Sequence, residues 1–124
     1  MPRQRSSRRP SRAADSAPEA PRALGLLETY GYTAAIQAAD AAAKAADVTV
    51  LGYHLTRGKG WVCVKIEGSV AAVQVAVEAA REWAGRVNQV VATQVIARPD
   101  DETTPLIRSR ETVGLGPRAR GEMD

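Results

Sequence analysis

The run from Tyr32 to Ala46 is dense in alanine, the residue with the highest intrinsic helix propensity, and therefore predicts a helix. Thr33 is a candidate N-terminal cap, because its hydroxyl can accept a hydrogen bond from a free backbone N–H. The small side chains of this run allow close approach to a sheet or to a neighbouring molecule. The chain has no Phe and only 4% aromatic residues, so the core must consist of small aliphatic side chains. We expect association with other copies to supply the burial that so small a core lacks.

Short apolar stretches on both sides of this helix predict four β-strands. They span residues 23–29, 48–55, 61–67 and 88–96. The third strand alternates, so that Val62, Val64 and Ile66 share one face. Its other face carries Trp61, Cys63, Lys65 and Glu67. This pattern predicts a strand that is buried on one side only.

The stretch from Val70 to Gly85 predicts a second helix, with Ser69 as its N-terminal cap and Gly85 at its end. Its apolar stripe consists of Val70, Val73, Val77, Ala80 and Ala84. The order β-α-β-β-α-β predicts an α+β, ferredoxin-like fold, with a four-stranded antiparallel sheet and both helices on one face. The other face must be covered or wet. Such a fold hosts many unrelated functions, so function has to be argued from sites.

Two polar extensions flank the domain expected at residues 23–99. Residues 1–22 are rich in Arg, Ser and Pro, and they hold six Arg against Asp15 and Glu19, so we expect a basic, disordered segment. Residues 100–124 form a polar C-terminal extension, in which we expect a short helix or turn around 102–108 and disorder beyond it. No apolar run approaches the roughly 20 residues of a membrane helix, and we expect no secretory signal peptide.

Catalytic chemistry is poorly supported by the sequence. The chain has one His and one Cys, and His54 and Cys63 are placed to face each other across a hairpin. No third group is available to orient them, and the acidic residues show no metal-ligand spacing. The sequence Gly58-Lys59-Gly60 joins two strands, whereas a phosphate-binding loop joins a strand to a helix. We expect no catalytic residue, metal or cofactor.

A nucleic-acid-binding module is an alternative. The sequence Lys59-Gly60-Trp61 matches the opening of the RNA-recognition strand motif, but the next three residues do not supply its aromatic rings. The first predicted strand offers no ring either, so the Arg-rich N-terminal segment would have to bind phosphates. A ferredoxin-like regulatory domain that binds a small effector is a third, weaker alternative.

The sequence resembles the bacterial microcompartment (BMC) domain family, specifically its hexameric shell proteins. The resemblance covers residues 23–99. It is carried by ALGLLETYGYTAAIQAADAAAKAADV at 23–48, LGY at 51–53, RGKG at 57–60 and VIARP at 95–99. The resemblance implies a non-enzymatic structural protein whose six-membered rings tile into the shell of a carboxysome or metabolosome in the cytoplasm. Its partners would be further copies, other shell proteins and enclosed enzymes, with neither a membrane nor nucleic acid.

The resemblance also assigns three sites. Lys44 matches a lysine that lines the edge of the ring, and Arg98 matches an arginine that reaches across the same edge. The loop of Arg57, Gly58, Lys59 and Gly60 matches the loop that points at the six-fold axis, where a positive ring would favour anionic or polar metabolites. The segment from Gly52 to Gly68 is one residue longer than in typical members. Whether Arg57, Gly58 or Lys59 lies closest to the axis is therefore left open.

Overall fold

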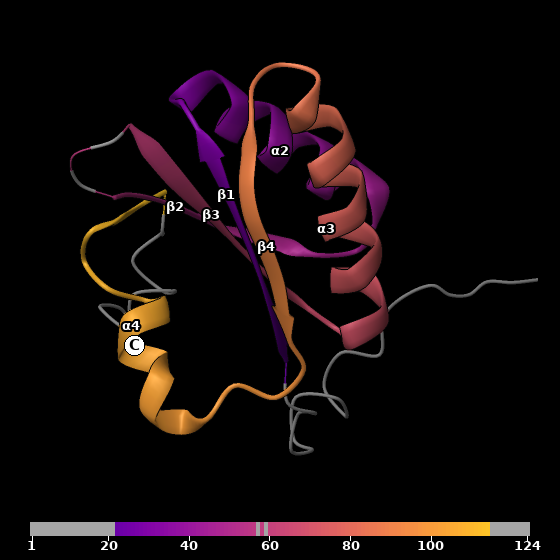
Figure 1. The fold of residues 1–124 in the computed structure, drawn as a ribbon. Helices are drawn as coiled ribbons and strands as arrows, with labels where there is room; N and C mark the ends of the chain where they lie inside the picture. Colours follow the sequence, from indigo (N-terminus) through magenta and orange to yellow (C-terminus); the bar gives the residue numbers. More distant parts are fainter. Residues whose placement is uncertain (1–21, 57, 59, 115–124) are drawn as a thin grey trace, which may run out of the picture.

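The computed structural model describes residues 22–56, 58 and 60–114 (Figure 1). The elements are β1 (Ala23–Tyr30), α2 (Tyr32–Ala45), β2 (Thr49–Leu55), β3 (Trp61–Gly68), α3 (Val70–Gly85), β4 (Val90–Ile96), the 3₁₀ helix η2 (Asp101–Thr103), α4 (Thr104–Ile107) and β5 (Thr112–Val113). The predicted order β-α-β-β-α-β is thereby confirmed for the part that ends with β4. Of the two expected extensions, residues 1–21 and 115–124 lie outside the described part of the chain.

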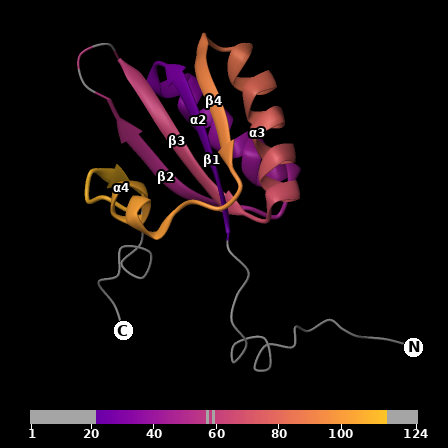
Figure 2. The same cartoon turned by 60° about the horizontal axis from the view of Figure 1, so that its bottom comes forward.

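The strands form one antiparallel sheet in the order β4-β1-β3-β2-β5. The helices α2 and α3 both cover one face of this sheet, as the sequence predicted, and they also pack against each other (Figures 1 and 2). Two helices on one face leave the opposite face of the sheet to be covered by other parts of the chain or by solvent.

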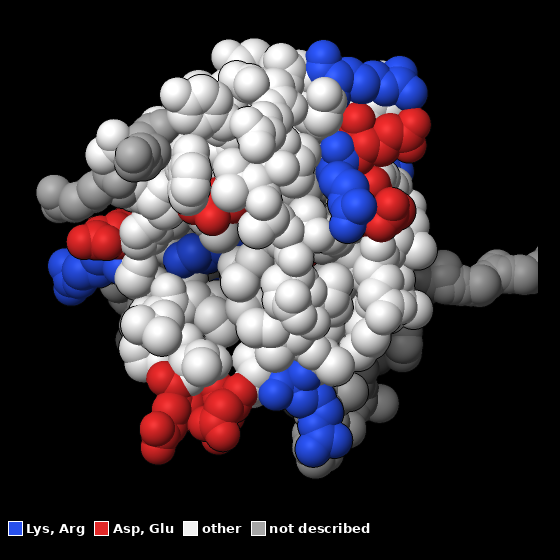
Figure 3. All heavy atoms as spheres, in the orientation of Figure 1, with Lys and Arg blue, Asp and Glu red and all other residues white. Residues whose placement is uncertain are grey.

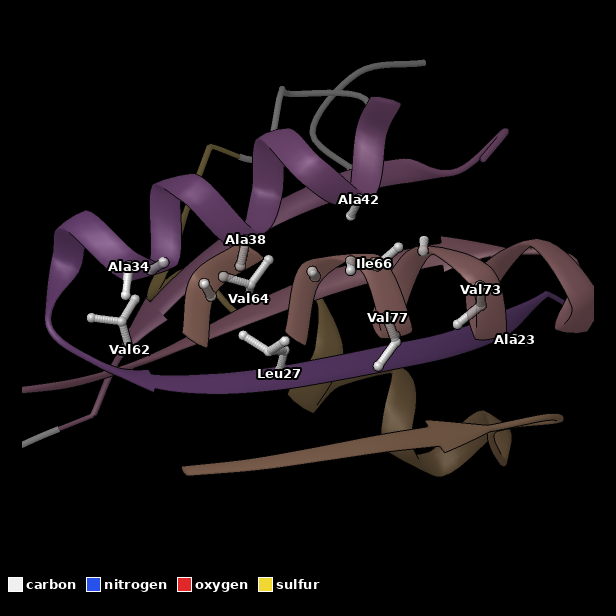
Figure 4. Packing of buried hydrophobic residues seen from close by; sticks show 14 residues of the cluster. Ala23, Leu27, Ala34, Ala38, Ala42, Val62, Val64, Ile66, Val73 and Val77 are labelled. Carbon is white, nitrogen blue, oxygen red and sulfur yellow. The ribbon is translucent and has the colours of Figure 1, made fainter. Parts of the chain in front are cut away.

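The core lies between the sheet and these two helices (Figure 4). Leu27 on β1 and Ile66 on β3 are fully buried there, so the face predicted for the alternating strand is confirmed. The helices contribute mainly small side chains: Ala34, Ala35, Ala38 and Ala42 from α2, and Val73, Ala76, Val77, Ala80 and Ala84 from α3. Val70, predicted to belong to the stripe, is 38% exposed because it begins the first turn of α3.

A close approach of α3 to β1 depends on Gly25. A Cβ atom at this position would lie 2.8 Å from Val73 Cγ1 and 2.8 Å from Val77 Cγ2. Real Cβ atoms essentially never make such short contacts, so with any larger residue Val73 and Val77 or the whole helix would have to shift. The glycine therefore sets the thickness of this two-layer core.

Of the two predicted N-terminal helix caps, the structure confirms one and shows that the other is wrong. Ser69 caps α3, because its Oγ accepts a 3.2 Å hydrogen bond from the Ala72 N–H. Thr33 does not cap α2, because the helix already begins at Tyr32 and Gly31 occupies the cap position without a side chain. The turn after β1 needs the φ of 99° that Gly31 adopts, and this fixes the helix start ahead of Thr33.

The chain after β4 folds back onto the sheet. We call residues 100–114 the strap. It holds η2 and α4 where a short helix or turn was expected, but it continues into β5, where disorder was expected. β5 pairs with β2 and makes a fifth strand in a sheet for which four strands were predicted. Thr112 within it is only 2% exposed.

Candidate pore hairpin and edge residues

The predicted pore loop joins β2 to β3. Gly58 and Gly60 within it have φ values of 91° and 76°, which other L-residues rarely adopt. Arg57 and Lys59 lie outside the described residues, so their assignment to the pore stays a prediction. Gly58 and Gly60 are both exposed.

Hydrogen bonds fix the base of this hairpin. The backbone N–H of Thr56 donates to Trp61 O at 3.0 Å, and the Thr56 hydroxyl donates to the same oxygen at 2.8 Å. On the other side, the Gly31 N–H donates to Gly60 O at 2.8 Å. The loop therefore leaves the sheet from a base that is held by both β2 and the start of α2.

Aromatic side chains gather at this end of the sheet. Tyr30 on β1 is the register partner of Trp61 on β3. Tyr32 and Tyr53 make an edge-to-face contact with ring centroids 5.3 Å apart, and the hydrogen bond that the Tyr53 hydroxyl makes to Tyr32 raises the pKa of Tyr53. The predicted first strand ended at Thr29, so the Tyr30–Trp61 pair was missed by sequence reasoning.

The two predicted edge residues are exposed. Lys44, in the last turn of α2, forms an ion pair with Asp40 at 2.9 Å, and its side chain is 77% exposed. A cation in the last turn is also favoured by the helix dipole. Arg98 follows β4 and has no hydrogen bond or ion pair within the part of the chain that the structure describes.

The strand register separates the loop from both edge residues. Tyr30 pairs with Trp61 at the hairpin end of the sheet, whereas Leu24 pairs with Ile96 at the other end. Arg98 comes two residues after Ile96. The 14-residue helix α2 starts next to Tyr30 and runs back for about 21 Å, at 1.5 Å per residue, so Lys44 also lies at the end away from the hairpin. The two predicted sites thus lie at opposite ends of the domain.

The predicted facing of His54 and Cys63 is confirmed, because they are register partners in β2 and β3. Glu111 of the strap lies 3.4 Å from His54 Nε2, a neighbour that sequence reasoning missed because it is 57 positions away. Burial, and then the charge of Glu28, raises the pKa of the Cys63 thiol. A nucleophilic thiol requires a lowered pKa, so this arrangement does not favour covalent catalysis.

Among the described residues, no three His, Cys, Asp or Glu side chains are grouped so that they could bind a metal ion. None of the helices in the same ranges is long and apolar enough to cross a membrane. Lys65 is a charged group in an unusual environment. It is 6% exposed, and burial lowers its pKa. The alternating sequence pattern correctly predicted which face of β3 carries the Lys65 side chain, but it did not predict that other residues cover this side chain.

Comparison with known proteins identifies the domain. The model of the BMC domain matches residues 23–99. The carboxysome shell protein CcmK2 of Synechocystis sp. is 42% identical over 92 residues, which cover 73% of this chain and 88% of that protein. The bacterial microcompartment shell protein PduK of Citrobacter freundii is 46% identical over 78 residues, or 63% of this chain. This chain spans about half of the length of PduK, since the match covers 50% of it.

A solved structure shows the same fold. It is a microcompartments protein from Desulfitobacterium hafniense DCB, which superimposes with a TM-score of 0.61 at 32% sequence identity. The match covers 73% of this chain and 51% of that one.

Proposed function

The chain belongs to the BMC domain family, and we propose that it is a structural shell protein of a bacterial microcompartment. In this proposal six copies form a ring, and the rings tile edge to edge, together with other shell proteins, around enclosed enzymes in the cytoplasm. The protein contributes a wall and an opening, and it performs no catalysis. The raised pKa of Cys63 and the absence of a grouped ligand set among the described residues support a role without a reactive centre.

The observation that carries the proposal is the separation of the hairpin from the two edge residues. A ring subunit needs one end at the axis and the other at the perimeter. The glycine-rich hairpin lies at one end of the sheet, and Lys44 and Arg98 lie at the other. Long side chains such as these can lay their stems along a neighbouring surface and donate to its carbonyl oxygens.

Exposed apolar side chains support association with further copies. A small domain without Phe leaves many large apolar residues accessible, among them Tyr30, Tyr32, Ile36, Leu55, Val75, Trp83 and Val87. Such side chains scattered singly need no explanation, but this number on one small domain fits a subunit that buries surface against neighbours.

The hairpin supplies the proposed opening. Glycines at Gly58 and Gly60 allow several backbones to crowd around one axis. Six copies of Lys59, with Arg57, would form a positive ring, and rings of charge select which ions pass. We therefore propose that small anionic or polar metabolites cross.

The edge can be tested by Lys44→Ala and Arg98→Ala, with Glu82→Ala as the matched control. Glu82 forms an i,i+4 ion pair with Arg86 at 3.0 Å, as Asp40 does with Lys44, so the control removes the same kind of contact and leaves Arg86 over the Trp83 ring. We expect both edge variants to form six-membered rings in electron micrographs but no extended sheets, whereas Glu82→Ala forms both. Edge variants that tile like the unaltered protein would remove the edge assignment. A purified protein that stays monomeric at high concentration would overturn the proposed function.

A further inference from the structure

The strap is anchored by a buried lysine. Lys65 on β3 donates hydrogen bonds to Leu106 O at 3.2 Å, Ile107 O at 2.9 Å and Thr112 Oγ1 at 2.7 Å. These three acceptors use the full donor capacity of an ammonium group. They all belong to the strap, and no carboxylate lies within ion-pair distance among the described residues. The hydrogen bonds to the strap therefore satisfy the buried ammonium group of Lys65, and they hold the strap in place.

A second contact on the same strand holds the strap. Glu67 lies two residues after Lys65, so both side chains leave the same face of β3. Its Oε2 accepts a hydrogen bond from Arg108 at 2.7 Å, and its Oε1 lies 3.5 Å from Arg22 Nε. The side chains of Glu67 and Arg108 are only 19% and 27% exposed, which strengthens the pair relative to one at the surface.

The backbone of β5 approaches β2 very closely. A Cβ atom at Gly52 would lie 2.2 Å from Val113 O, so no side chain fits at this position. Gly52 also has a φ of 142°, which L-residues with side chains rarely adopt. β5 then pairs with the end of β2, where Val113 is the register partner of Tyr53 and Thr112 is the register partner of His54. Three independent contacts therefore fix the strap in one position.

The tip of the strap, Arg110 and Glu111, lies beside the base of the hairpin. One groove is lined by His54, Leu55, Thr56, Arg110, Glu111 and Val113. Glu111 is paired with His54 at 3.4 Å, whereas Arg110 has no hydrogen bond or ion pair in the described ranges. Figure 3 shows acidic and basic side chains together over the turn before β5, at the left margin of a largely uncharged face. The strap thus carries charge to the loop that the proposed function places at the axis.

We propose that the strap is part of the pore mouth, and that Arg110 and Glu111 are a second determinant of which charged solutes pass. This inference rests on the proposed shell function. In a six-membered ring the tip would contribute six positive and six negative groups next to the hairpin. Removing the positive groups then leaves the negative groups unbalanced, and removing the negative groups leaves the positive ones unbalanced. The electric field at a narrow opening changes with this balance of charge. We call Lys65 and Glu67 the latch. Their contacts with the strap hold its tip beside the hairpin.

The test measures the reversal potential of sheets of the protein, laid over a small aperture with a gradient of potassium chloride across it. Arg110→Gln is expected to shift the selectivity toward cations, and Glu111→Gln toward anions. Matched controls are Arg86→Gln and Glu82→Gln, an exposed pair at the C-terminal end of α3 that does not line the groove. We expect these controls to leave the reversal potential unchanged. Opposite shifts from two neighbouring, similar-sized substitutions are not produced by a general loss of structure.

Lys65→Met tests the latch. It keeps an unbranched chain but removes every donor, so the amides of Thr112 and Val113 should exchange with solvent at least about tenfold faster. With the tip released, Glu111→Gln should no longer shift the reversal potential in this background. Unchanged exchange at Thr112 and Val113 would overturn the role of Lys65.

Lys59→Glu separates the two levels of the proposal. If it shifts the reversal potential while Arg110→Gln and Glu111→Gln do not, the strap has no part in selectivity and the pore proposal stands. If all three variants match the unaltered protein, the pore proposal fails together with the inference drawn from it. If Lys59→Glu and Arg110→Gln shift the selectivity toward cations and Glu111→Gln shifts it toward anions, the pore proposal and the inference about the strap are both supported.

Discussion

Lys65 Nζ donates a 2.7 Å hydrogen bond to Oγ1 of Thr112, which lies 47 positions later in the sequence. This contact joins the centre of the sheet to its last strand. Both side chains are buried, so the bond is made away from competing water. It explains why a short, polar C-terminal segment is part of the folded domain.

Replacing Lys65 by Met should destabilise the protein. The carbonyl oxygens of Leu106 and Ile107 lose their side-chain donor, and such losses in buried surroundings cost about 1–3 kcal/mol. Urea unfolding followed by circular dichroism measures the change. Thr112→Val removes one of the three acceptors and should cost less. Equal or greater stability of Lys65→Met would mean that the cost of burying the charge exceeds the value of its hydrogen bonds.

The stability should also depend on pH through Lys65. Burial lowers its pKa from the usual 10.5, against the opposing charges of Cys63 and Glu111. Between the lowered value and 10.5, the unfolded chain binds a proton that the folded chain does not, so the free energy of unfolding rises with pH in that window. The raised pKa of Cys63 acts in the opposite direction above its usual 9.0.

The comparison is therefore made in a Cys63→Ser background, with and without Lys65→Met. The difference in unfolding free energy between the two proteins should grow in favour of Lys65 as the pH rises from about 8 to about 10. A difference that stays flat or shrinks over this range contradicts a lowered pKa.

Gly52→Ala should detach β5. The new Cβ would lie 2.2 Å from the backbone oxygen of Val113, and backbone cannot move aside as a flexible side chain can. Fast amide exchange at Thr112 and Val113 is the expected result. Gly85→Ala is the control, since a Cβ there meets nothing within 4 Å and lies in a helix, where Ala is favoured over Gly by about 1 kcal/mol. Similar exchange rates in both variants would contradict the close approach.

The two helix starts should respond differently to the loss of a hydroxyl. Ser69→Ala removes an acceptor for the Ala72 N–H and should lower the stability by about 1 kcal/mol. Thr33→Ala should have no such cost, since Thr33 lies inside α2 and Ala is the better helix former. Thermal unfolding of both variants measures this. A larger loss from Thr33→Ala than from Ser69→Ala would place the cap at Thr33 after all.

The sequence predicts the core elements well because their signals are local. The alanine-dense run, the alternation around Val64 and the Ser69 cap each act within a few residues, and the structure has α2, β3 and α3 there. The Thr33 cap failed because the start of α2 is set by a turn that hydrogen-bonds to Gly60, a distant residue.

The strap could not be predicted for the same reason. Its position depends on Lys65, Glu67 and Gly52, which lie far from it along the chain. A lysine on the polar side of an alternating strand is usually solvated, and a polar segment with Pro and Gly is usually a loop. Nothing in the local pattern of either segment reveals that they are partners.

The pairing of β5 with β2 also bears on how the purified protein behaves at high concentration. An uncovered sheet edge offers unpaired N–H and C=O groups to any strand of another molecule, which is a common start of fibrous aggregation. At Tyr53 and His54 these groups are already taken by Val113 and Thr112. The segment therefore protects part of one edge of the sheet, where Tyr53 and His54 cannot pair with a strand of another molecule.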